Sequence, residues 1–161
     1  MFEWNTTYKL HSADIDAQHE QAFALAMELR ATLGSGQENG VSDILGRMVG
    51  HFRDHFESEE KLMMRIGFPG LVEHKKLHRA MMTRLEKLAS DSRTGLASDS
   101  REMMEFLRDW LSHQTGTDMA MLPFITGSRM STALAQWIEV LNRAEDELST
   151  ANAVPLNNLL T

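Results

Sequence analysis

Apolar residues recur at helical spacing in four long segments of the chain, and glycine-rich or polar stretches separate these segments. The pattern predicts helices over residues 16–33, 42–66, 71–89 and 99–125, with Ser42 as the N-cap of the second helix and a polar loop over residues 91–98. The third helix is expected to bury Leu77, Met81 and Leu85. Long helices joined by short polar links pack antiparallel. The chain is therefore predicted to be all-α, an up-down-up-down antiparallel four-helix bundle with an additional C-terminal helix.

The additional helix is predicted from a fifth periodic segment, whose apolar face carries Leu134, Trp137, Ile138 and Leu141. We divide the chain into a bundle over residues 1–127, this helix over residues 128–150, and a tail or linker over residues 151–161. An apolar face of this size needs a cover. We expect the helix either to pack on the bundle, to mediate self-association, or to lead into an output domain of a larger protein.

Composition narrows the class of protein. The chain has 161 residues, no cysteine and a net charge of −7. Without cysteine it can form neither disulfides nor thiolate metal sites. Nucleic-acid binders carry basic patches, but no Lys/Arg cluster here is longer than a pair. No apolar run approaches the roughly 18 residues of a membrane span, and the N-terminus lacks the features of a signal peptide. We therefore expect a cytoplasmic protein that binds neither nucleic acid nor membranes.

Histidines and carboxylates occupy positions where core side chains belong. Five of the seven histidines continue the apolar stripes, and two carboxylates accompany them. The resulting set is His19, His55, Glu59, His74, His78, His113 and Asp118. Such groups are costly to bury unpaired, and a bound metal removes the cost by giving each donor a partner. His11 and His51 lie outside the set and are expected not to be ligands.

The spacing of the donors fits a site for two metal ions. His55/Glu59 and His74/His78 are i,i+4 pairs, so each pair lies on one helix face. Seven donors exceed what one metal needs, and nitrogen and oxygen donors without sulfur suit iron, with zinc or manganese as competitors.

The fourth helix poses a geometric problem. A step of five residues, from His113 to Asp118, leaves two side chains about 140° apart on an ideal α-helix. Both can face the centre only if the helix loosens locally, for which a π-bulge is one route. Gly116 lies between them, where backbone strain is most easily absorbed.

The order of these donors resembles the ligand pattern of the bacterial hemerythrins. Along the chain it runs through a histidine in a Gln-His pair, then His-xxx-Glu, His-xxx-His and His-xxxx-Asp. Trp4, Gly67-Phe68-Pro69 and Trp110-Leu111 extend the resemblance, which covers about residues 1–125. It implies that His74, His78 and His113 hold one iron and that His19 and His55 hold the other. Glu59 and Asp118 would bridge both irons, with an oxo or hydroxo group as the third bridge.

The function implied by the resemblance is reversible dioxygen binding, in an oxygen carrier or store or in an oxygen- or redox-sensing domain. A di-iron oxidase or peroxidase, or a protein that handles iron or nitric oxide, is the alternative. The resemblance places Trp110 and Gln114 near the ligand pocket. Gln114 stands where the family usually has an apolar residue. It is expected to hydrogen-bond the ligand or to admit water, the second effect dominating, unless it points to solvent.

Overall fold

The computed structural model describes residues 6–35, 40–94 and 100–127. Met1–Ile125 form one compact unit, and Thr126–Thr161 form a second. The predicted C-terminal helix over residues 128–150 and the tail over residues 151–161 lie outside the described residues.

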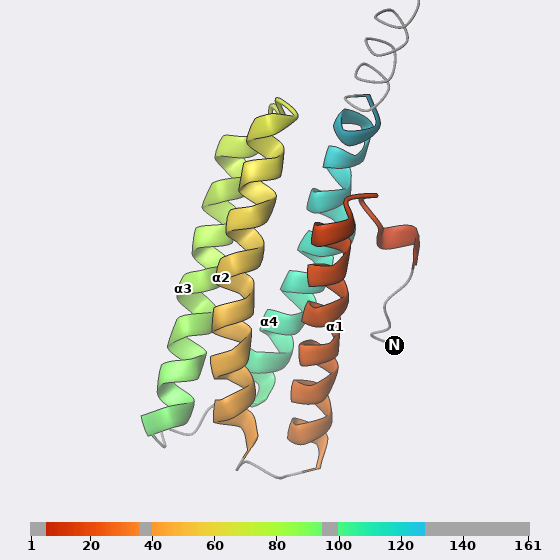
Figure 1. Ribbon diagram of the computed structural model, residues 1–161. Helices are drawn as coiled ribbons and strands as arrows, with labels where there is room; N and C mark the ends of the chain where they lie inside the picture. The colour runs from red at the N-terminus through yellow and green to blue at the C-terminus, as the bar shows by residue number, and fades with distance from the viewer. Residues whose placement is uncertain (1–5, 36–39, 95–99, 128–161) are drawn as a thin grey trace, which may run out of the picture. The chain divides into compact units, whose positions relative to one another are not determined.

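Four long helices make up the first unit. They are α1 (Ala13–Gly34), α2 (Val41–Arg65), α3 (Leu71–Thr94) and α4 (Ser100–Ser112), and a short 3₁₀ helix η1 (Thr6–Tyr8) precedes them. The chain continues from α4 through a π-helical segment η3 (His113–Thr117) and a 3₁₀ turn η4 (Asp118–Met121) into helical residues 122–127. Successive helices run in opposite directions, and α1 closes the bundle against α4 (Figure 1). The predicted all-α, up-down-up-down bundle is confirmed.

Three local predictions were wrong. The N-cap of α2 is Gly40, and Ser42 lies inside the helix. α3 continues to Thr94, into the predicted polar loop, where Lys87 pairs with Asp91 at 2.6 Å one turn away and supports the helix. Leu77 is 45% exposed, because the inward face of α3 is taken by the residues in line with His74 and His78.

The interior holds two apolar clusters. The larger one is centred on aromatic rings: Trp110 meets Phe23 at 5.0 Å and Phe52 at 5.5 Å between centroids, both edge-to-face. The smaller one comprises Leu10, Ile15, Leu62, Met63, Met121 and Ile125. Along each of the four chain segments the candidate donors fall between a residue of one cluster and a residue of the other. The donors therefore form a polar layer between two apolar clusters, which pack against it from both sides.

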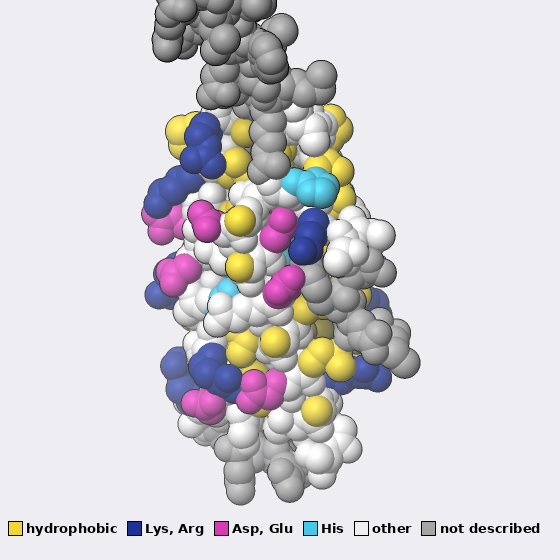
Figure 2. Space-filling model, turned by 45° about the vertical axis from the view of Figure 1, so that its right-hand side comes forward, with side chains coloured by type: hydrophobic (Ala, Val, Ile, Leu, Met, Phe, Trp, Pro, Cys, Tyr) yellow, Lys and Arg dark blue, Asp and Glu magenta, His cyan; other side chains and the backbone are white. Residues whose placement is uncertain are grey.

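The surface carries charges of both signs. Acidic and basic side chains alternate on the face seen in Figure 2, with hydrophobic side chains between them. Among the described residues, charged side chains form local and interhelical ion pairs, such as Arg53 with Glu86 at 2.9 Å and Lys61 with Glu57 at 2.6 Å. None of the described helices is both long enough and apolar enough to cross a membrane.

Candidate metal centre

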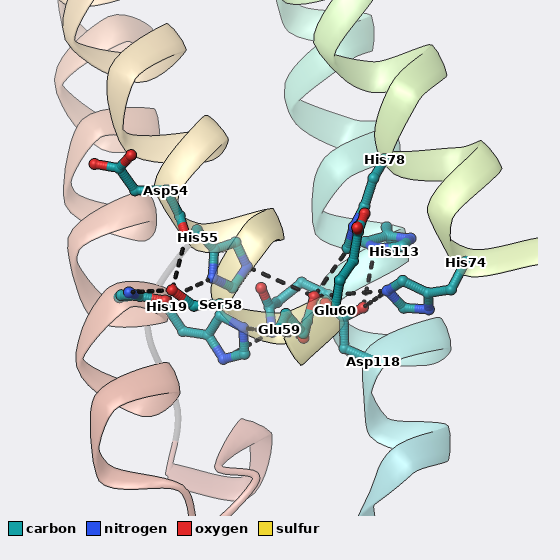
Figure 3. A network of polar contacts seen from close by, with 12 residues as sticks. His19, Asp54, His55, Ser58, Glu59, Glu60, His74, His78, His113 and Asp118 are labelled. Carbon is teal, nitrogen blue, oxygen red and sulfur yellow. Dashed lines mark hydrogen bonds and ion pairs between the residues drawn. The ribbon is translucent and has the colours of Figure 1, made fainter. Parts of the chain in front are cut away.

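The seven predicted donors come together from all four helical segments (Figure 3). α1 supplies one, α2 and α3 supply two each, and the segment after α4 supplies two. Every one of them is buried, and the most exposed, His113, is only 7% exposed. They fall into two groups of mutually close ligand atoms: Glu59, His74, His78, His113 and Asp118; and His19, His55 and Glu59.

Glu59 lies at the middle of the arrangement. Its Oε1 is 3.8 Å from His19 Nε2, and its Oε2 is 3.9 Å from His55 Nε2. On the opposite side the same Oε2 is 3.3 Å from His78 Nε2 and 3.6 Å from His74 Nε2. One carboxylate thus faces imidazoles of both groups, the position that a bridging ligand requires.

Asp118 is the second carboxylate of the larger group. Its Oδ1 lies 2.9 Å from His113 Nε2 and 3.1 Å from His74 Nε2. It can face this way because residues 113–117 form a π-helical turn, in which the Asp118 N–H donates to the His113 carbonyl. A bond between residues five apart sets them one above the other, as the α-helical bond does for residues four apart.

The predicted π-bulge is therefore confirmed, but the role predicted for Gly116 is not needed. Gly116 does not have a left-handed φ, and a Cβ added there would meet no atom within 4 Å. The wide turn does not depend on a glycine at this position.

The donor atoms are buried without ordinary partners. Ten buried side-chain nitrogen and oxygen atoms of the described residues lack a hydrogen bond, and nine belong to the donor set. They include both oxygens of Glu59 and of Asp118 and the Nε2 atoms of His55, His74, His78 and His113. Buried polar atoms in native proteins are otherwise almost always paired, so this cluster has the chemistry of a metal-binding site.

Burial and neighbouring charges shift the pKa values of three donors. Burial lowers the pKa of His55 to about 4, which leaves its imidazole neutral at pH 7. Burial opposes ionisation of Glu59, but the nearby imidazoles of His19, His74 and His78, at 3.8, 3.6 and 3.3 Å, outweigh this effect and hold the pKa of Glu59 well below its usual range. Burial also opposes protonation of His74, yet Asp118 and Glu59 raise its pKa to about 9. Metal binding at His74 must therefore displace a proton.

Comparison with known proteins decides the family. The model of the hemerythrin HHE cation binding domain matches residues 11–125, which is most of this chain. The chain belongs to the hemerythrin family. The metal-binding cluster and the bundle thus agree with an independent comparison of the sequence.

Individual relatives support the assignment. The chain is 27% identical to a bacteriohemerythrin of Stenotrophomonas maltophilia (strain R551-3) over 118 residues, 73% of this chain and 76% of that protein. It is 27% identical to a hemerythrin-like protein of Naegleria gruberi over 119 residues, 73% of this chain and 88% of that protein. A crystal structure of a hemerythrin mutant matches with a TM-score of 0.69 at 23% identity, over 78% of this chain and 97% of that one. This last likeness concerns the fold alone.

Two further residues were expected at a hemerythrin ligand pocket. Trp110 is 1% exposed and lies within the larger apolar cluster. Gln114 is fully buried, with its Nε2 at 3.0 Å and 2.9 Å from the two ring nitrogens of His19. The alternative that Gln114 points to solvent was wrong, because the π turn directs it inward together with His113.

The two remaining histidines are members of neither group of donors. His11 is exposed and precedes α1. His51 is half-buried and stacks on His55 at 6.2 Å, with its Nε2 2.9 Å from the carbonyl oxygen of Gln18. Burial lowers the pKa of His51, which favours the neutral ring in that hydrogen bond.

Two polar residues, Gln18 and Glu60, contact donor histidines, and their positions on the helices do not predict these contacts. Gln18 Oε1 lies 3.2 Å from His55 Nδ1, and Glu60 Oε1 lies 3.1 Å from His78 Nδ1. Both directly neighbour a donor in the sequence, Gln18 before His19 and Glu60 after Glu59. The available signal was therefore adjacency within a motif. Which histidine each one contacts depends on the packing of α1 and α3 against α2.

Proposed function

We propose that the chain binds two iron ions through His19, His55, Glu59, His74, His78, His113 and Asp118. His74, His78 and His113 would hold one iron and His19 and His55 the other, and the carboxylates of Glu59 and Asp118 would be shared between them. The observation that carries it is the pair of buried donor groups that share Glu59. Seven nitrogen and oxygen donors without sulfur suit iron.

We further propose that the physiological reaction is reversible binding of dioxygen or a related small ligand. Two iron ions held by these residues would supply the electrons for reversible dioxygen binding. The protein's part is to keep the layer dry. Phe56 stacks on His78 with ring centroids 3.9 Å apart and faces His113 edge-on at 6.4 Å, and it covers the larger donor group with an apolar ring. Apolar clusters close the layer on both sides.

Gln114 and Trp110 are the residues we assign to the ligand pocket. The Oε1 atom of Gln114 is buried without a hydrogen bond, so the amide has an acceptor to offer a protonated ligand or a water molecule beside His19. Family membership and the histidine-rich donor set favour a carrier, store or sensor over an oxidase, since ferritin-like oxidases use carboxylate-rich sites with Glu-x-x-His motifs.

Metal analysis and spectroscopy test this proposal together. Protein from iron-replete cells should contain close to two iron atoms per chain. Its visible spectrum should change when oxygen is admitted and return when oxygen is removed, without consumption of peroxide in a turnover assay. One tightly bound zinc ion with no visible absorption would refute the di-iron site. Rapid catalytic turnover of peroxide would instead favour the enzyme alternative.

A further inference from the structure

Two of the candidate ligand histidines use their outer ring nitrogens differently. On the His55 side, the Ser58 hydroxyl donates to the Asp54 carbonyl at 2.8 Å, so the Ser58 oxygen can accept from Gln18 Nε2 at 3.4 Å. This orients the amide of Gln18 with Oε1 toward His55 Nδ1 at 3.2 Å. His55 therefore donates from Nδ1 to a neutral amide oxygen, and its Nε2 lone pair faces the centre.

The corresponding partner of His78 is a carboxylate. Glu60 Oε1 lies 3.1 Å from His78 Nδ1, while the other oxygen of Glu60 lies 3.1 Å from the Lys75 ammonium. A carboxylate only accepts hydrogen bonds, so His78 must carry its proton on Nδ1. Its Nε2 lone pair then points inward, where Glu59 Oε2 lies 3.3 Å away.

Glu60 lies between the buried layer and solvent. Its side chain is 20% exposed, whereas that of His78 is 2% exposed. Both line a groove of about 390 Å³ on the outer face of α2 and α3, which Arg53, Phe56, Arg79 and Met82 also line. The carboxylate is thus close enough to the interior to act on His78, and it retains a cationic partner, Lys75, toward the exterior.

We propose that Glu60 is a positioning residue that fixes the orientation of His78 and increases its donor strength, which makes the two metal positions electronically unequal. A hydrogen bond from imidazole to a carboxylate is charge-assisted and roughly twice as strong as one to a neutral acceptor. It draws the Nδ1 proton outward and leaves Nε2 more electron-rich. The metal at His78 should therefore be bound more tightly, and its higher charge state favoured, relative to the metal at His55. This inference rests on the proposed metal site.

The decisive variant is Glu60→Gln, which keeps an acceptor oxygen but removes the charge. Outer partners of ligand histidines typically contribute about 10- to 100-fold to metal affinity. We expect zinc affinity at one of two positions, measured by competition with a chromophoric chelator, to fall about tenfold. Glu60→Ala should lose more, because it also removes the acceptor. If Glu60→Gln binds zinc like the wild type, the charge has no role and the proposal is overturned.

The iron-loaded protein provides a second readout. A tenfold larger loss of ferric than of ferrous affinity corresponds to a rise of about 59 mV in a one-electron midpoint potential. We expect a rise of this size in Glu60→Gln by spectroelectrochemistry. Lys75→Gln leaves the charge of Glu60 less neutralised and should lower the potential. If the midpoint potential of Lys75→Gln rises, as that of Glu60→Gln is expected to do, the proposal is overturned. Because the two variants are expected to shift the potential in opposite directions, the Lys75→Gln result tests the proposal even if Glu60→Gln folds poorly.

Glu57→Gln is the matched control. Glu57 lies on the same helix and lines the same groove, but its partner is Lys61 and its side chain is 64% exposed. The Glu57→Gln substitution removes the same charge as Glu60→Gln, at a residue that pairs with Lys61 and not with a ligand histidine. Equal shifts in Glu57→Gln and Glu60→Gln would reduce the effect to net charge and refute the specific role. Zinc affinity does not require iron or dioxygen, so failure here is distinguishable from failure of the proposed function, which the iron content and oxygen response of the wild type decide.

Discussion

Removing the metal should destabilise the bundle by an amount comparable with the stability of a whole domain. Ten buried atoms of the described residues lack a hydrogen bond, and five remain when His74 Nδ1, Gln114 Oε1 and three atoms that pair when His74 is protonated are set aside. Those three are His74 Nε2, Asp118 Oδ1 and Glu59 Oε2. An unsatisfied buried polar atom costs about 1–3 kcal/mol. Even at the lower limit the sum is about 5 kcal/mol, against a total of about 5–15 kcal/mol for a typical domain.

Thermal unfolding converts this estimate into a temperature. For a chain of this size, 1 kcal/mol shifts the Tm by about 2–4 °C, so chelation should lower the Tm by roughly 10–20 °C. The assay is circular dichroism melting of iron-loaded protein, of chelated and dialysed protein, and of protein reloaded with zinc. Reloading should restore most of the loss.

A metal-free double variant, Glu59→Gln with Asp118→Asn, is the control, because chelator should leave its Tm unchanged. Chelated wild-type protein that melts within about 5 °C of the loaded protein would refute the reasoning. It would mean that side-chain rearrangement or water satisfies the donors as well as a metal does.

Three further predictions concern individual residues. Asp118→Ala should lose metal from both positions, whereas His19→Ala should mainly affect one; full two-metal occupancy of Asp118→Ala by elemental analysis would remove Asp118 from the site. Gly116→Ala should keep both metals and raise the free energy of unfolding by about 0.4–1 kcal/mol in urea titration, since the backbone there accepts a Cβ; loss of metal would show that the π turn needs glycine. The metal-free protein should be most stable near pH 6.5. Burial lowers the pKa of His55 from 6.5 to about 4, so stability falls as the pH falls through that range. Against the effect of burial, Asp118 and Glu59 raise the pKa of His74 from 6.5 to about 9, so its contribution to stability is lost as the pH rises through that range. A stability that only rises or only falls with pH would contradict these assignments.

Much of the bundle could be predicted because its helices are long and their apolar stripes regular. The proximity of the seven donors followed from the same periodicity, since His55, Glu59, His74 and His78 continue those stripes. Even the local irregularity at His113 could be anticipated, because five residues cannot place two side chains on one face of an α-helix. Because His113 and Asp118 must both point to the centre, their spacing in the sequence predicts the wide helical turn between them. Apolar residues, which can face the core over a broad arc, give no such constraint.

Other features depend on interactions that no single helix displays. α3 extends to Thr94 through a polar stretch whose side chains bond within the helix, as Lys87 does to Asp91 and the Thr94 hydroxyl to the Asp91 carbonyl. Leu77 is exposed because histidines take the inward face beside it. The inward direction of Gln114 and the contacts of Gln18 and Glu60 arise only when the helices are assembled. Periodicity identifies which residues face the interior but not which pairs meet there.

The π turn also bears on how such sites are recognised in genes. Residues 113–118 place a histidine above a carboxylate with five residues per step, whereas His55 and Glu59 achieve the same relation with four. The two spacings differ by one codon. An insertion or deletion of three bases at this point can therefore leave the donors facing each other while it changes the written motif. Searches that demand a fixed interval between ligands would separate proteins whose centres are geometrically the same.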